Sequence, residues 1–214
     1  MPDSGAGLYT HGMVSSLLQT GAEGAIISYG AAEPGVDCPE GLDVFYAPSP
    51  RRPRIFSLLS TLQSDAWRMR SRSLLDLLDQ ALAREPDLVV IDYFAMGWVL
   101  NHLEAKLATM PKRPKLVHVT HNYEKEVRRT VARSSPRFWM RWVMTLDAVK
   151  AGWLEDRLVA AADLVTAITD EDRRSYLAAS PGKAVITLKP GYDGEIAPTA
   201  PITEETPRKV VLVG

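Results

Sequence analysis

The sequence has little of what marks several large classes of protein. A single cysteine, Cys38, stands among 214 residues, which excludes an internal disulfide and favours a reducing compartment. No stretch approaches the ~20 apolar residues that span a bilayer, and the first residues lack the basic segment and apolar core of a signal peptide. These absences favour a cytoplasmic protein.

Excess charge and internal repetition are also missing. The formal net charge is −1, whereas a dedicated nucleic-acid-binding domain is usually strongly basic, so nucleic acid is not expected as a partner. The sequence contains no repeat of fixed period and no low-complexity tract. The composition, 46% hydrophobic and 24% charged, is that of an ordinary globular chain with enough apolar residues for one sizeable core.

Helix and strand patterns alternate along the chain. Apolar spacing predicts helices over 8–20, 55–84 (one helix, or two joined near 71–73), 96–108, 124–158 (interrupted at 134–136) and 170–178. Short apolar runs predict strands over 25–30, 42–47, 88–91, 115–120, 164–168 and 185–188. The run over 88–91 is continuous, which is typical of a strand covered on both faces. This order predicts an α/β fold with one doubly wound, mostly parallel sheet, whose ligands bind at the carboxyl ends of the strands.

Polar side chains follow two of these strands. Asp92 and Tyr93 end one strand, and His121, Asn122 and Glu124 follow another. A histidine at such a position can orient the hydroxyls of a polar substrate and titrates near neutral pH. The alternative is that Asn122 caps the next helix, with Glu124 in its first turn. No pair of histidines or cysteines has metal-ligand spacing, so no metal site is expected.

A short glycine-rich segment, Ser4-Gly5-Ala6-Gly7, precedes the first predicted helix. Glycines let backbone N–H groups approach a phosphate closely, and a helix N-terminus favours anions. A flexible start followed by a helix cap is the alternative. A nicotinamide-binding domain is disfavoured, because Thr10 replaces the third glycine of that motif and no acidic residue ends the strand at Tyr29.

Basic and aromatic residues are interleaved over residues 125–150. Such a segment can dock on an anionic membrane surface, and residues 136–153 are the candidate contact. The alternative, which the pattern favours, is a helix pair whose aromatic side chains pack on the sheet while the arginines are solvated. A non-catalytic fragment or membrane-surface module built on this segment is therefore one hypothesis for the function.

The end of the chain indicates a domain boundary. Residues 196–207 are rich in proline, threonine and glutamate and are predicted to form a linker. The apolar run within 208–214 reads as a buried strand. We therefore assign residues 1–195 to one Rossmann-like domain and 208–214 to the first strand of a second domain.

Taken in order, these segments resemble the N-terminal half of a retaining, nucleotide-sugar-dependent glycosyltransferase of family 4, which has the GT-B fold. The matching segments cover nearly the whole chain. They are Ser4-Gly5-Ala6-Gly7, His121-Asn122-x-Glu124, Glu155-x(7)-Asp163-x-Val165-x-Ala167-Ile168-Thr169-x-x-Asp172, Pro190-Gly191-Tyr192-Asp193 and 208–214.

The resemblance implies an activity and roles for particular residues. A sugar, of hexosyl type, passes from a nucleotide-sugar co-substrate to a glycan or lipid-linked acceptor, without a cofactor. Gly5 and Gly7 approach the donor phosphates, and His121 lines the cleft as the candidate catalytic residue. Asp92, Tyr93, Asn122 and Glu124 are the candidate substrate-binding residues. The family's first strand and donor-binding domain are expected to be absent, so this chain alone is expected to be inactive.

Overall fold

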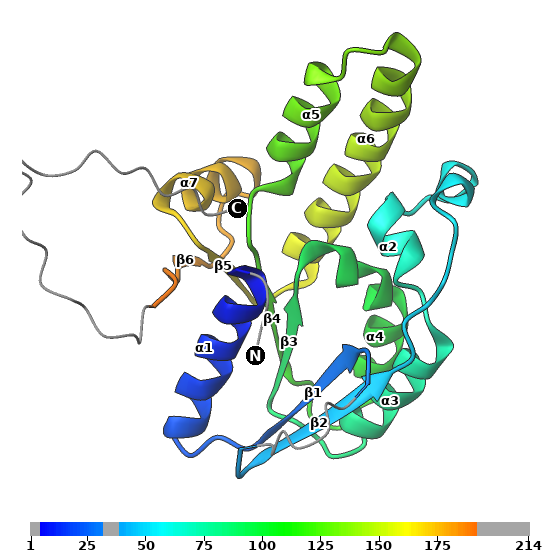
Figure 1. Cartoon of the computed structure of the whole chain (residues 1–214). Coiled ribbons are helices and arrows are strands. Elements are labelled where there is room, and N and C mark those ends of the chain that lie inside the picture. The colour runs from blue at the N-terminus through cyan, green and yellow to red at the C-terminus, as the bar shows by residue number, and fades with distance from the viewer. Residues whose placement is uncertain (1–4, 32–38, 192–214) are drawn as a thin grey trace, which may run out of the picture.

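The computed structural model describes residues 5–31 and 39–191, and the predicted linker and the strand after it lie outside this part (Figure 1). All strand pairs among the described residues are parallel, which confirms the predicted α/β class. The strands are β1 (Gly24–Tyr29), β2 (Leu42–Ala47), β3 (Leu88–Asp92), β4 (Lys115–Val119), β5 (Leu164–Ala167) and β6 (Val185–Thr187). The helical elements are α1 (Gly5–Gln19), η1 (Arg54–Leu59), α2 (Ser64–Arg68), α3 (Arg72–Leu82), η2 (Phe94–Val99), α4 (Leu100–Leu107), α5 (Glu124–Ser134), α6 (Phe138–Ala161) and α7 (Asp170–Ala179).

The predicted single sheet is divided in two. β1 pairs with β2, and the other strands form a sheet in the order β3-β4-β5-β6. The pair β1-β2 is held by α3, which packs on both strands, and by the Tyr29 hydroxyl, which donates to the carbonyl of Met69. Leu88 and Val90 of β3 are 42% and 36% exposed, so the prediction that this strand is covered on both faces was wrong.

The region predicted as one or two long helices is broken into three short elements. Gln63 caps the start of α2, where its side-chain oxygen accepts hydrogen bonds from the N–H groups of Asp65 and Ala66. Ser71 caps α3 by accepting from the N–H of Leu74. Capping side chains satisfy N–H groups that a helix leaves unbonded at its start, so each one favours a new helix over continuation.

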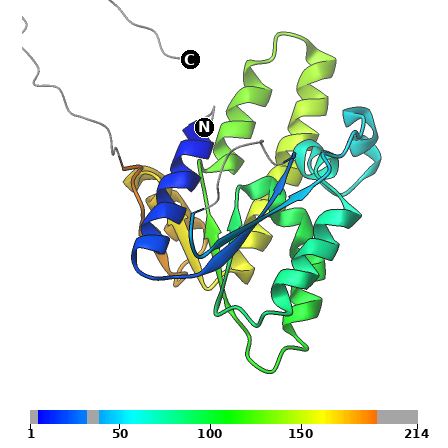
Figure 2. The ribbon, with the colours of Figure 1, turned by 60° about the horizontal axis from the view of Figure 1, so that its bottom comes forward.

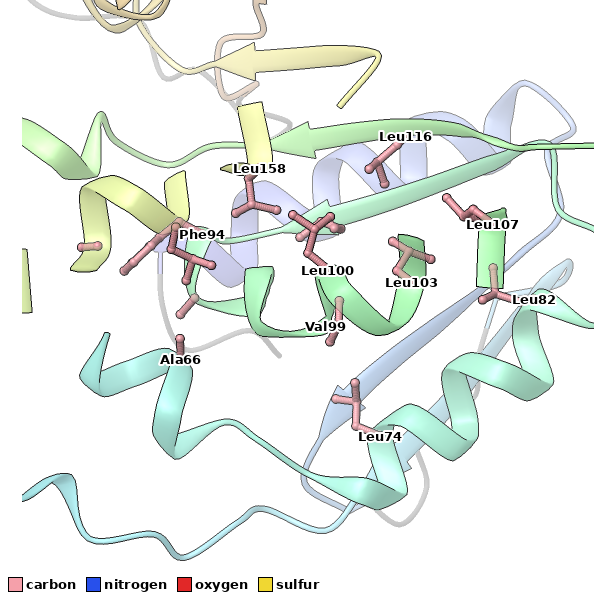
Figure 3. Close-up of a cluster of buried hydrophobic side chains, with 14 of the residues drawn as sticks. Ala66, Leu74, Leu82, Phe94, Val99, Leu100, Leu103, Leu107, Leu116 and Leu158 are labelled. Carbon is pink, nitrogen blue, oxygen red and sulfur yellow. The ribbon is translucent and has the colours of Figure 1, made fainter. Parts of the chain in front are cut away.

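The main hydrophobic core lies under β3 and β4 (Figure 3). In this view η2 and α4 lie between these strands and the layer formed by α2 and α3. Leu100 and Leu103 of α4 are fully buried, and Leu154 and Leu158 of α6 reach into the same cluster. This core fixes the backbone of β3, whose last residue belongs to the candidate site.

α5 and α6 form a helical hairpin that extends past the carboxyl ends of β3 and β4 (Figures 1 and 2). The chain reverses at 135–137, where Pro136 stands, as the sequence predicted. Leu154, Glu155 and Leu158 of α6 are buried, whereas the far end of the hairpin is exposed. No helix in the described part of the chain is long and apolar enough to cross a membrane.

Two glycines provide a matched test of this packing. A Cβ at Gly97 in η2 would lie 2.7 Å from Cδ1 of Leu158, whereas a Cβ at the exposed Gly12 in α1 would meet nothing within 4 Å. We expect Gly97→Ala to lower the free energy of unfolding by about 1–3 kcal/mol, because the core must shift to admit the methyl group. Gly12→Ala should raise it by about 0.5–1 kcal/mol, since alanine is the better helix former. Urea denaturation of both variants measures the difference, and equal effects would contradict the packing described.

Candidate functional site

The carboxyl ends of β3 and β4 bring two of the predicted polar segments together. β3 and β4 pair in parallel with Asp92 opposite Val119, so the residues that follow each strand emerge side by side. The two strand ends are therefore neighbours in the sheet. The site is therefore built on rigid backbone at the edge where parallel sheets bind ligands.

Asp92 and His121 form a hydrogen-bonded pair at this edge. Nε2 of His121 lies 2.6 Å from Oδ1 of Asp92, and the histidine side chain is only 10% exposed. The hydroxyl of Thr10 in α1 donates to the other oxygen of the same carboxylate. Because a carboxylate oxygen accepts, the Nε2 that faces it carries a proton, which leaves Nδ1 as the acceptor in the neutral form of the ring. The carboxylate thus fixes both the orientation and the tautomer of the imidazole.

Aromatic rings enclose the imidazole. Tyr9 of α1 meets His121 edge-on at 5.5 Å between ring centres, and Tyr93 does so at 6.3 Å. The Tyr9 hydroxyl donates to the carbonyl of Leu188 at 2.9 Å, and burial raises the pKa of this phenol. Tyr9 and Thr10 were not predicted as site residues, because nothing in their local sequence distinguishes them from other helix positions.

Tyr93 has an unusual backbone conformation. Its φ is 72° and its ψ is 130°, a region that a side chain makes unfavourable. Its N–H donates to the carbonyl of Val119, which holds the strained turn against β4. Strain of this kind costs about 1–3 kcal/mol and is found preferentially at functional sites. Burial is the main reason that the pKa of the Tyr93 phenol is raised to about 12, so the group is a neutral hydroxyl at neutral pH.

Glu124 does not face the Asp92–His121 pair. Its carboxylate accepts from Nε of Arg128 at 3.0 Å, and Arg128 also binds Asp65 at 2.8 Å and lies over the ring of Phe94. Burial would raise the pKa of Asp65, but hydrogen bonds from Arg128 and Gln63 outweigh it and lower that pKa. The four-residue spacing of Glu124 and Arg128 is visible in the sequence, whereas the contact with Asp65 spans 63 residues and is not.

The alternative in which Asn122 caps the following helix was wrong in its capping residue, although Glu124 does lie in the first turn of α5. The residue before α5 is Tyr123, which makes no side-chain capping bond. The start of α5 is capped instead by Glu155 of α6, which accepts from the N–H groups of Glu124 at 3.0 Å and Lys125 at 2.8 Å. The side chain of Asn122 is exposed at the carboxyl edge, where it is available to a ligand.

Gly5 and Gly7 lie in the first turn of α1, not in a loop before it as predicted. The alternation of small residues in this segment is compatible with a helix, and Thr10, one turn further on, contacts Asp92. The amino end of α1 is thus directed toward the same edge as the Asp92–His121 pair (Figure 1). A helix N-terminus favours an anion at this position.

A pocket of about 480 Å³ adjoins the site. It lies between Tyr29 at the end of β1, Tyr93, and two arginines, Arg54 and Arg68. Its size is within the usual range for small-molecule sites. A larger hollow of about 700 Å³ lies at the opposite, amino-terminal edge of β5 and β6, away from the polar strand ends, and we do not include it in the site.

Comparison with known proteins gives the family. The family model described as a glycosyl transferase 4-like domain matches residues 4–190, and the chain belongs to this family. No curated protein matches the chain significantly. The matched region contains all of the described site residues.

Glu155, which holds the start of α5 beside this site, is expected to make the stability of the fold depend on pH. Burial raises the pKa of this carboxyl to about 7, against the hydrogen bonds it accepts from Tyr176 and the start of α5. The folded protein therefore keeps a proton that the unfolded chain releases near its ordinary pKa of 4.5. We expect the free energy of unfolding to fall as the pH rises from about 5 to 7, by about 3 kcal/mol.

Denaturation at a series of pH values measures this slope. Glu155→Gln should flatten it, because the amide does not titrate, whereas Glu126→Gln, at an exposed position in the first turn of α5, should leave it in place. A slope unchanged in the Glu155 variant would assign the pH dependence to other groups.

Proposed function

We propose that this glycosyl transferase 4-like domain is the acceptor-side half of a retaining enzyme that moves a sugar, of hexosyl type, from a nucleotide-sugar donor to an acceptor. The observation that carries this proposal is the Asp92–His121 pair, held at 2.6 Å at the carboxyl edge of a parallel sheet beside a pocket. The family membership supports a sugar donor and acceptor as the substrates.

His121 is the catalytic residue in this proposal. Nε2 of His121 is bonded to Asp92, so Nδ1 can accept a hydrogen bond from a hydroxyl of the transferred sugar. This bond holds the sugar in position as the leaving group departs. Asp92 positions His121 and is itself held by Thr10. Such positioning depends on side chains fixed before the substrate arrives, and the low exposure of His121 meets this requirement.

The amino end of α1 takes the donor phosphates. Gly5 and Gly7 lie in its first turn, where the absence of side chains lets a diphosphate approach the backbone closely. The helix dipole then stabilises the negative charge that develops on the departing nucleotide diphosphate. This role requires no metal ion or cofactor from this domain.

Tyr93 and Asn122 are the acceptor contacts in this proposal, together with Asp92. Tyr93 lines the pocket, and Asn122 is exposed at the adjacent strand end. Glu124 acts on the acceptor indirectly, since its carboxylate holds Arg128. The acceptor is a glycan or a lipid-linked molecule, and for the latter the segment 136–153 makes peripheral membrane contact. Because the donor is held by a second domain, the acceptor-side domain does not turn over by itself.

A histidine pair elsewhere in the chain provides a control for the test. His102 and Asp79, on α4 and α3, form the same kind of contact at 2.7 Å, but away from the strand ends. In the enzyme complete with its donor-binding domain, we expect His121→Ala to lower kcat by about 100-fold or more. His102→Ala removes a comparable contact and should leave kcat unchanged.

Steady-state transfer from a panel of nucleotide sugars measures kcat, and thermal unfolding of both variants checks the fold. If His121→Ala retains kcat while the protein remains folded, the proposed role is wrong. If His121→Ala loses activity because it unfolds, His121 has a structural role instead.

A further inference from the structure

The outer side of α6 carries a continuous exposed apolar stripe. Trp139, Trp142, Leu146, Val149 and Trp153 recur at steps of three and four residues, which places them on one side of the helix. All five are exposed, and Trp142 and the adjacent Phe138 are each 77% exposed. The prediction that the aromatic residues of this segment pack on the sheet was therefore wrong.

The apolar surface continues onto η1. Nζ of Lys150 in α6 donates to the carbonyl of Ser57 at 2.8 Å, which ties η1 to the side of α6. Ile55, Phe56 and Leu59 of η1 are exposed, and Leu59 is 90% exposed. We call the stripe on α6, Phe138 and these three residues the α6–η1 face. Apolar surfaces of this extent on a folded domain mark interaction sites.

The charge at the far end of the hairpin has one sign. Residues 127–146 contain five arginines and no acidic residue. One of them, Arg128, is bound to carboxylates of the core. Within the described part of the chain, no carboxylate lies at ion-pair distance from the other four, which are Arg129, Arg133, Arg137 and Arg141. We therefore expect a partner that offers both apolar groups and negative charge to this face.

We propose that the α6–η1 face docks on a bilayer that contains anionic lipids. Tryptophan rings favour the level of the lipid headgroups, where one part of the ring is in apolar and the other in polar surroundings. Arginines on the same hairpin are attracted to anionic headgroups by about 1 kcal/mol each. A second copy of the chain is a poorer partner, because it would bring two sets of unpaired arginines together.

This inference rests on the membrane contact of the proposed function but not on the transfer reaction. The hairpin extends beyond the carboxyl edge that carries His121 (Figures 1 and 2). Docking through the hairpin would thus hold the site close to the lipid headgroups, within reach of a lipid-linked acceptor.

Vesicle binding tests the inference without any donor or acceptor. The chain is titrated with vesicles of phosphatidylcholine alone and with vesicles that contain one-third phosphatidylglycerol, at low and high salt. Three of the five tryptophans, Trp139, Trp142 and Trp153, lie on the α6–η1 face, so insertion should shift the emission to the blue and allow quenching by brominated lipids. We expect the chain to bind the anionic vesicles but not those of phosphatidylcholine, and we expect high salt to weaken this binding.

Paired variants assign the binding to this face. The double variant Arg137→Gln with Arg141→Gln should weaken binding to anionic vesicles by about 30-fold, because each arginine contributes about fivefold. The control, Lys112→Gln with Arg113→Gln, removes the same charge from the loop before β4, at the opposite end of the sheet. Phe138→Ser with Trp142→Ser should abolish quenching by brominated lipids, whereas Leu17→Ser, at an exposed position of α1, should not.

Several outcomes would overturn the inference. One is no binding to anionic vesicles at low salt, and another is binding that the arginine control reduces as much as the hairpin variant. A dimer in light scattering that Phe138→Ser with Trp142→Ser dissociates would assign the face to a second copy. Because His121→Ala should bind vesicles normally, a failure of docking remains distinguishable from a failure of the proposed transfer reaction.

Discussion

The backbone around the site depends on the buried carboxylate of Glu155. It accepts two N–H groups at the start of α5 and the hydroxyl of Tyr176 in α7 at 2.6 Å, and that hydroxyl also lies 3.1 Å from the carbonyl of Asn122. One side chain of α6 thereby joins α5, α7 and the strand end that carries His121. Burying a carboxyl is costly unless it is hydrogen-bonded, and here the donors come from two separate helices, α5 and α7.

Other acidic residues of the same sequence motif act in a similar way. Asp163 accepts from the N–H of Leu116 at 2.8 Å, and Asp172 accepts from the N–H of Tyr123 at 3.3 Å. These carboxylates satisfy backbone donors at the start of β4 and in the turn after it. This motif thus supports the backbone around the candidate site, whose polar side chains lie on α1, at the end of β3 and in the segment after β4.

Much of the fold could be predicted from periodicity. The short apolar runs became β1 to β6 within one or two residues, and Pro136 marked the reversal between α5 and α6. The candidate site was predicted less completely. Asp92 and His121 were chosen because both follow strands, whereas Thr10 and Arg128 reach the site through contacts of 82 and 63 residues in sequence separation, which no local pattern encodes. Glu124 was assigned to substrate, but Arg128 occupies its carboxylate.

The sequence by itself determined the class of fold, the family and the residues that end the strands, because these depend on local composition, periodicity and the order of motifs. The tertiary structure alone decided which of those residues meet. Parallel pairing in register places Asp92 beside the chain that leads to His121, and the packing of α6 on η2 leaves its tryptophans exposed. An apolar stripe looks the same in sequence whether it is covered or not, since burial depends on what other segments of the chain supply to cover it.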